Sequence, residues 1–215
     1  MPFPTTSVID NFNRANEGPP PSANWSGPIR PGQPRLKVVT NQVVANADDN
    51  AEDYWSNATF GPDSEAYITI PTFSNDHSSV YLRLQAPGTA GVDGYRELSS
   101  AFSSVTQIYR VDDTVHTQLG ADISQAWSNG DAHGADIVVS TITAYRKPSG
   151  GSWGSLGTRT DNTYAGAGNI GLNMNSINQT GDDFGGGTIA SAVFTKIVGG
   201  RGPGMALAGS GGLVA

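Results

Sequence analysis

The chain has 215 residues, no cysteine and a formal net charge of −7, and only 14% of its residues are charged. The lack of cysteine excludes disulfides and thiolate metal sites, and the scattered basic residues exclude the Lys and Arg clusters that nucleic acid or an anionic membrane surface attracts. No apolar run reaches the roughly 20 residues that span a bilayer, so we expect no nucleic-acid partner and no membrane insertion.

Short stretches of alternating apolar and polar residues predict β-strands from the start of the chain. The first strand is predicted at residues 8–12. The proline-rich residues 13–35 then predict a long irregular segment that Trp25 anchors to the body of the domain. A hairpin is predicted at 37–44, because the Asn of Thr40-Asn41 suits a tight two-residue turn.

The remaining strands are predicted, in chain order, at 54–59, 65–70, 80–85, 95–102, 107–111, 115–119, 135–147 (two strands or one bent strand), 153–159, 169–175, 183–184 and 192–198. Before 65–70, Gly61 and Pro62 favour a turn, Asp63 or Ser64 is expected to bond the backbone, and Glu65 begins the polar face of the strand. No segment shows a helical period. Such short strands predict an all-β fold of two antiparallel sheets, a sandwich or jelly roll.

Few constellations of residues point to chemistry. The three histidines, His77, His116 and His133, lie in unrelated segments without a metal-ligand spacing, and a serine-nucleophile elbow is absent. Acidic residues are plentiful, but no ExDxxE-like pattern places two of them on one face of a strand. A hydrolase would therefore need a pair of carboxylates from strands that are distant in the sequence. The acidic run at 48–53 is interpreted as a solvated loop, with calcium binding as its alternative.

Several stretches together resemble the concanavalin A-like, or laminin G-like, jelly-roll domains of bacterial surface proteins and phage virion proteins. They are DNFNRAN at 10–16, NWS at 24–26, TFGPDSEAYITI at 59–70, VYLRLQ at 80–85, GY at 94–95, STITAYR at 140–146, NIGLNM at 169–174 and DDFGGGT at 182–188. The resemblance implies a single jelly-roll domain over 1–198, with one concave and one convex sheet. Residues 199–215 are of low complexity and predict a flexible Gly-rich tail, or alternatively a docking strap.

The resemblance also implies where ligands bind. A structural calcium is expected where the first and last strands meet, near Asp10 and Asp183. Sugar-binding candidates are Tyr81, Arg83, Tyr95 and Arg96, which are expected on the concave face, and Trp127, whose position at a turn suits sugar stacking or, alternatively, packing.

The function that the resemblance implies is that of a non-enzymatic phage virion surface protein, such as a minor tail, fibre or capsid-decoration protein that adheres to host-surface glycans. The opening MPFPTTSVIDNF lacks the charged and apolar regions of a secretory signal, which suits a virion protein assembled in the host cytoplasm. Expected partners are other virion subunits or further copies of the chain, since strand edges invite pairing. The alternatives are a carbohydrate-binding module of a bacterial surface protein and a glycoside hydrolase.

Overall fold

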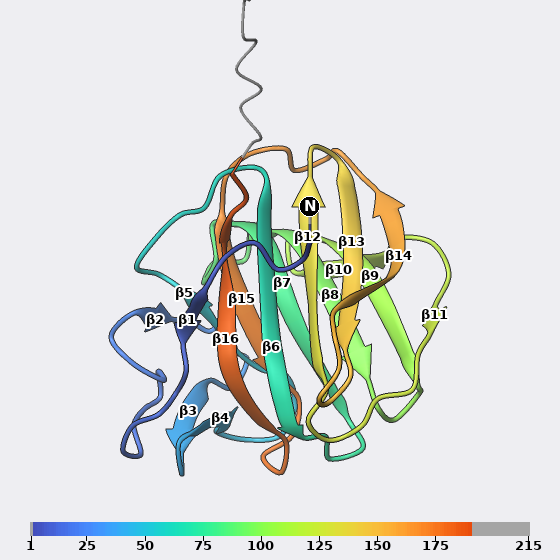
Figure 1. Ribbon diagram of the computed structural model, residues 1–215. Coiled ribbons are helices and arrows are strands. Elements are labelled where there is room, and N and C mark those ends of the chain that lie inside the picture. The colour runs from blue at the N-terminus through green and yellow to red at the C-terminus, as the bar shows by residue number, and fades with distance from the viewer. Residues whose placement is uncertain (1, 191–215) are drawn as a thin grey trace, which may run out of the picture.

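The computed structural model describes residues 2–190, which form two antiparallel β-sheets packed face to face (Figure 1). Residue 1 and residues 191–215 lie outside the described range, and with them the predicted strand at 192–198 and the predicted tail at 199–215. No helix within residues 2–190 has the length and apolar character needed to cross a membrane. The prediction of an all-β sandwich is confirmed.

Sheet A has the strand order β14-β13-β12-β6-β16-β4-β3, and β1 pairs with β16. Its strands are β1 (Val8–Asp10), β3 (Leu36–Val39), β4 (Gln42–Ala45), β6 (Ser64–Thr72), β12 (Ala132–Val138), β13 (Thr141–Lys147), β14 (Gly154–Thr160) and β16 (Thr180–Thr188). In Figure 1 this sheet faces the viewer, and the first residues of the chain cross in front of it.

Sheet B has the order β10-β9-β8-β7-β15-β5-β2, and β11 pairs with β9. Its strands are β2 (Trp25–Ser26), β5 (Ala51–Trp55), β7 (His77–Gln85), β8 (Asp93–Ser100), β9 (Val105–Asp112), β10 (Val115–Gln118), β11 (Ile123–Ser124) and β15 (Asn169–Met174). The predicted stretch 135–147 belongs to two strands, β12 and β13, which pair as a hairpin.

The core between the sheets follows from the alternation of the strands. Val80 and Leu82 of β7 point inward and meet Ile68 and Ile70 of β6 in one buried cluster. Burial of each such side chain contributes roughly 1.5–3 kcal/mol. Every second residue of β7 therefore faces away from sheet A. The sequence predicts the glycan site on this outer face of sheet B.

The predicted hairpin is confirmed: β3 and β4 are joined by Thr40 and Asn41, both with positive φ. The interpretation of 48–53 as a solvated loop is wrong for its second half, because β5 begins at Ala51. Glu52 and Asp53 are fully buried. Burial is tolerated because each carboxylate is paired with an arginine of the Pro-rich segment.

Candidate functional site

The outer face of sheet B has a buried arginine at its centre. The strand register places Arg96 of β8 between Tyr81 of β7 and Tyr109 of β9. The Arg96 Nε donates to Ser79 Oγ at 2.8 Å, and its Nη2 donates to Asn173 Oδ1 at 3.2 Å. Its partners are neutral, and no carboxylate among residues 2–190 lies within 4.0 Å of its guanidinium.

The Pro-rich segment packs against part of this face through Ile29 and Arg30. Ile29 packs in a buried cluster with Tyr81, and the Arg30 Nη2 lies 3.0 Å from Glu52 Oε2. The Tyr81 hydroxyl donates to the same Glu52 oxygen at 3.0 Å. The carboxylate of Glu52 is therefore held by two protein donors, and a ligand has no open path to it.

The structure places the predicted sugar-binding residues in the interior. Tyr81, Arg83, Tyr95, Arg96 and Trp127 have exposed fractions from 0 to 8%. Tyr95 points into the core and donates to Asp161 at 2.8 Å. The Trp127 indole packs on His133 and donates to the Val105 carbonyl at 3.2 Å. The structure therefore does not expose these five side chains to a glycan.

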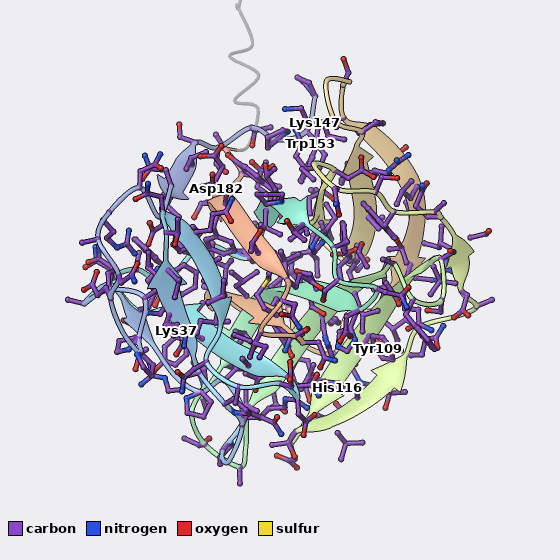
Figure 2. The ribbon with its side chains drawn as sticks, turned by 90° about the horizontal axis from the view of Figure 1, so that it is seen from below. Lys37, Tyr109, His116, Lys147, Trp153 and Asp182 are labelled. Carbon is purple, nitrogen blue, oxygen red and sulfur yellow. The ribbon has the colours of Figure 1, made fainter. Side chains whose placement is uncertain are left out.

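His116 at the rim of this face is expected to stay neutral well below neutral pH. It lies beside Tyr109, and both are on the opposite side of the molecule from Trp153 (Figure 2). Burial, followed by the positive charges of Arg96 and Arg30, lowers the pKa of His116 from 6.5 to about 3. An NMR titration of the imidazole should therefore show no midpoint near 6.5, and a midpoint there would contradict this environment.

Because folding lowers the pKa of His116, the protein should become less stable as the pH falls. The unfolded chain binds this proton at pH values where the folded chain does not, so the stability contribution of His116 is complete above pH 6.5 and is lost as the pH falls toward 3. The loss is at most about 1.4 kcal/mol for each pH unit. Urea unfolding of wild type and His116→Gln should show a smaller pH dependence in the variant.

An open cleft of about 510 Å³ lies where β1, the Pro-rich segment and β5 meet. It is lined by Val8, Ile9, Asp10, Asn11, Arg14, Ser22, Asn24 and Trp55. Asn24 is exposed, and its side-chain amide makes no hydrogen bond to another described residue. Trp55 is only 7% exposed and packs in the core, so the accessible lining is mainly polar, and a concave polar surface is suited to a small polar ligand.

One wall of this cleft is an arginine–aspartate pair that sequence reasoning missed. The Arg14 Nη1 and Nη2 donate to the two Asp10 oxygens at 2.6 and 2.9 Å. The turn that brings them together is local, because the Phe12 N–H donates to Asp10 Oδ1 at 2.9 Å. The signal was present in DNFNR, where the two residues are four positions apart.

The residues around Asp10 do not fit the expected calcium ion. Asp10 Oδ1 accepts from Phe12 and Arg14, and Oδ2 accepts from Arg14 and from Trp25 Nε1 at 2.8 Å. A carboxylate has about four lone-pair positions, so Asp10 keeps none for a metal. Asp183 is exposed on β16. Within residues 2–190, no group of three or more His, Asp or Glu side chains is placed to hold a metal ion.

Two neighbouring carboxylates on the outer face of sheet A are covered by the chain itself. Glu65 of β6 and Asp136 of β12 are opposite each other in the register, and burial raises the pKa of Asp136. Glu65 Oε1 accepts from the backbone N–H groups of Thr5 and Thr6, each at 2.6 Å. The Phe3 ring stacks on Tyr145 at 3.9 Å over the same pocket. This pair therefore lines a partly covered cavity of about 190 Å³ and not an open cleft.

No protein-family model and no curated protein sequence matches the chain. Solved structures are similar to it at low identity. The carbohydrate-binding module CBM66 from Bacillus subtilis is 11% identical with a TM-score of 0.57, and the match covers 75% of this chain and 91% of that one. The VIP36 exoplasmic/lumenal domain bound to Ca2+ and Man3GlcNAc is 10% identical with a TM-score of 0.56, covering 86% and 89%.

A prokaryotic β-1,3-1,4-glucanase (lichenase) derived from a mouse hindgut metagenome is also similar, at 11% identity and a TM-score of 0.55, covering 82% of this chain and 96% of that one. A carbohydrate-binding module, the VIP36 domain and a glucanase are thus similar to the chain to the same degree, so the similarity shows the fold and not the activity. Together with the two-sheet topology, these matches show that the chain has the concanavalin A-like jelly-roll fold.

Proposed function

We propose that the protein is a non-enzymatic carbohydrate-binding jelly-roll protein whose glycan site is the cleft beside Asp10. The observation that carries the proposal is the cleft itself, since its volume of about 510 Å³ is open and polar side chains, Asn11, Ser22 and Asn24 among them, line its walls. Sugar hydroxyls both donate and accept hydrogen bonds. The Asn24 amide and the Ser22 hydroxyl, which line the cleft, offer both functions.

Binding without turnover is favoured by the state of the nearby acids. Glycoside hydrolysis needs a carboxylic acid and a second carboxylate that both reach the scissile bond. At the cleft, Asp10 is held by Arg14 and by the Trp25 indole. On the outer face of sheet B, Glu52 is held by Arg30 and Tyr81. These carboxylates already accept charge-assisted or indole hydrogen bonds, which leaves them poorly suited to general acid or base work.

Removing the free amide at the cleft should weaken glycan binding. Asn24→Ala is expected to lower the affinity for a glycan identified on an array by about tenfold, because one or two hydrogen bonds of this kind contribute about 1.4 kcal/mol. Isothermal titration calorimetry measures the difference. The matched control is Asn178→Ala, another exposed asparagine whose side chain makes no bond to a described residue and which does not line the cleft. Equal affinity of the two variants would contradict the site.

We further place this function on the surface of a phage particle, as a minor tail, fibre or decoration protein. The support is the ordered set of motifs from DNFNRAN to DDFGGGT, which resembles such domains. Other virion subunits or further copies of the chain would be its protein partners, and the sheet-edge strands β10 and β14 are suited to pair with them. An antibody against the chain should label purified particles. Labelling of a bacterial surface instead would favour the alternative, a carbohydrate-binding module of a bacterial surface protein.

A further inference from the structure

The Arg14 guanidinium lies in a shell of oxygen atoms. Two of these oxygens belong to Asp10, at 2.6 and 2.9 Å. The Glu17 carboxylate contributes a third at 3.0 Å from Nε, and the Pro21 carbonyl contributes a fourth at 2.8 Å from Nη2. Two carboxylates and a backbone carbonyl around one positive charge are the kinds of donor that calcium prefers in proteins.

This shell joins parts of the fold that belong to different sheets. Asp10 ends β1 of sheet A, and the Trp25 that donates to it begins β2 of sheet B. Glu17 and Pro21 lie in the Pro-rich segment between these two strands. The Arg14 guanidinium, together with Asp10, therefore fixes β1, the Pro-rich segment and β2 of sheet B relative to one another.

The charges at this point require a cation. Asp10 is 7% exposed, and a buried carboxylate without a positive partner is strongly disfavoured. Arg14 supplies that charge from the chain itself, four residues away. The Asp10 hydrogen bond raises the pKa of Arg14 above its ordinary value. The guanidinium is therefore charged at every pH at which the domain is folded.

We propose that the Arg14 guanidinium replaces a structural divalent cation at the junction of β1 and the Pro-rich segment. The domain then keeps its fold without calcium. If the cleft binds a glycan as proposed above, that binding also persists in the presence of a chelator. The first statement is independent of the glycan proposal, because it concerns stability and metal binding alone.

The test uses terbium, a luminescent calcium analogue that a nearby tryptophan sensitises. Trp25 donates to Asp10 at 2.8 Å and is therefore positioned to report a metal in this shell. The wild-type chain should show no sensitised emission and the same Tm in calcium and in chelator. Arg14→Ala removes the internal cation and leaves the oxygens of Asp10, Glu17 and Pro21. This variant should show a lower Tm in chelator, a Tm that rises with calcium, and terbium emission.

The matched control is Arg35→Ala, which also removes an arginine from a buried carboxylate. The Arg35 Nη2 lies 2.6 Å from Asp53 Oδ1, and Arg35 has no second carboxylate within 4.0 Å among residues 2–190. This variant should lose stability without gaining terbium emission. Calcium stabilisation of the wild type would overturn the proposal, and so would an Arg14→Ala variant that calcium does not stabilise. Glycan binding plays no part in these readouts, so the two proposals fail separately.

Discussion

Replacing Arg83 with methionine is expected to lower the free energy of unfolding by about 3–5 kcal/mol, because several backbone carbonyls lose a charged donor at once. The Arg83 side chain is 1% exposed. Its Nε donates to the Pro62 carbonyl, Nη2 to the Val139 carbonyl at 2.8 Å and Nη1 to the Tyr164 carbonyl at 3.0 Å. These acceptors belong to three separate loops, so one guanidinium fixes three connections at the same end of the sandwich.

Urea unfolding measures this loss, and Arg110→Met is the matched control. Arg110 is bonded to the carboxylates of Asp112 and Asp161, and its side chain is 29% exposed. Solvent screens such pairs, so this variant should lose much less stability than Arg83→Met. If both methionine variants lost the same free energy, the carbonyl bonds of Arg83 would not be the source of its effect.

Removing Glu97 should have a similarly large effect, about 3–5 kcal/mol for Glu97→Ala, because it leaves a buried polar partner uncompensated. Glu97 of β8 and His133 of β12 meet between the two sheets, with Oε2 2.7 Å from Nδ1 and both side chains fully buried. Glu97 Oε1 also accepts from Ser99 Oγ. The substitution thus removes the acceptor of His133 and one of the two hydrogen-bond partners of Ser99.

A double-mutant cycle separates this interaction from the loss of side-chain volume. Glu97→Leu and His133→Leu should each be strongly destabilising. The double variant should lose less free energy of unfolding than the sum of the two single variants, because two apolar side chains of similar volume leave neither partner as an unpaired buried polar group. Glu17→Ala, at an exposed carboxylate, should cost little. Additive effects of the two leucine substitutions would show that the pair is not coupled.

The architecture could be predicted from the sequence because apolar and polar residues alternate along most of the strands. The hairpin at 37–44 and the strand at 65–70 follow from residue pattern and turn chemistry, whereas the pattern at 135–147 leaves two strands and one bent strand equally open, and the structure shows the two-strand hairpin. The N-terminal half of β5 could not be read in this way. Its Glu52 and Asp53 look like a solvated acidic run, and only the arginines of a distant segment make their burial acceptable.

The face of each side chain was harder to predict than the strands themselves. The sequence pattern puts Tyr81 and Arg83 on one face, but the register shifts between Leu82 and Gln85 and Arg83 has a φ of 50°. Such a bulge re-aims a side chain, and Arg83 points to the loops instead of to the sheet. Tyr95 and Arg96 are consecutive in a regular strand, so they point to opposite faces and cannot line one site together.

At the candidate site, the sequence identified Asp10 but not its chemistry. The resemblance implied a metal, whereas the structure surrounds the carboxylate with Arg14, Trp25 and a backbone N–H. A spacing of four residues in a non-helical segment carries no fixed geometry, since the turn that closes it depends on the Asp10 side chain itself. The cleft could not be predicted either, because its walls come from β1, the Pro-rich segment and β5, which only the fold brings together.

The most direct test of glycan binding at the cleft is an NMR titration of isotope-labelled protein with a glycan selected on an array. The proposed function predicts that shifts concentrate on the Asn24 side-chain amide, the Trp55 indole and the backbone of Asn11, which line the cleft. Shifts confined to the outer face of sheet B, around Tyr109 and His116, would contradict that site. The absence of binding to any glycan would contradict the function as well.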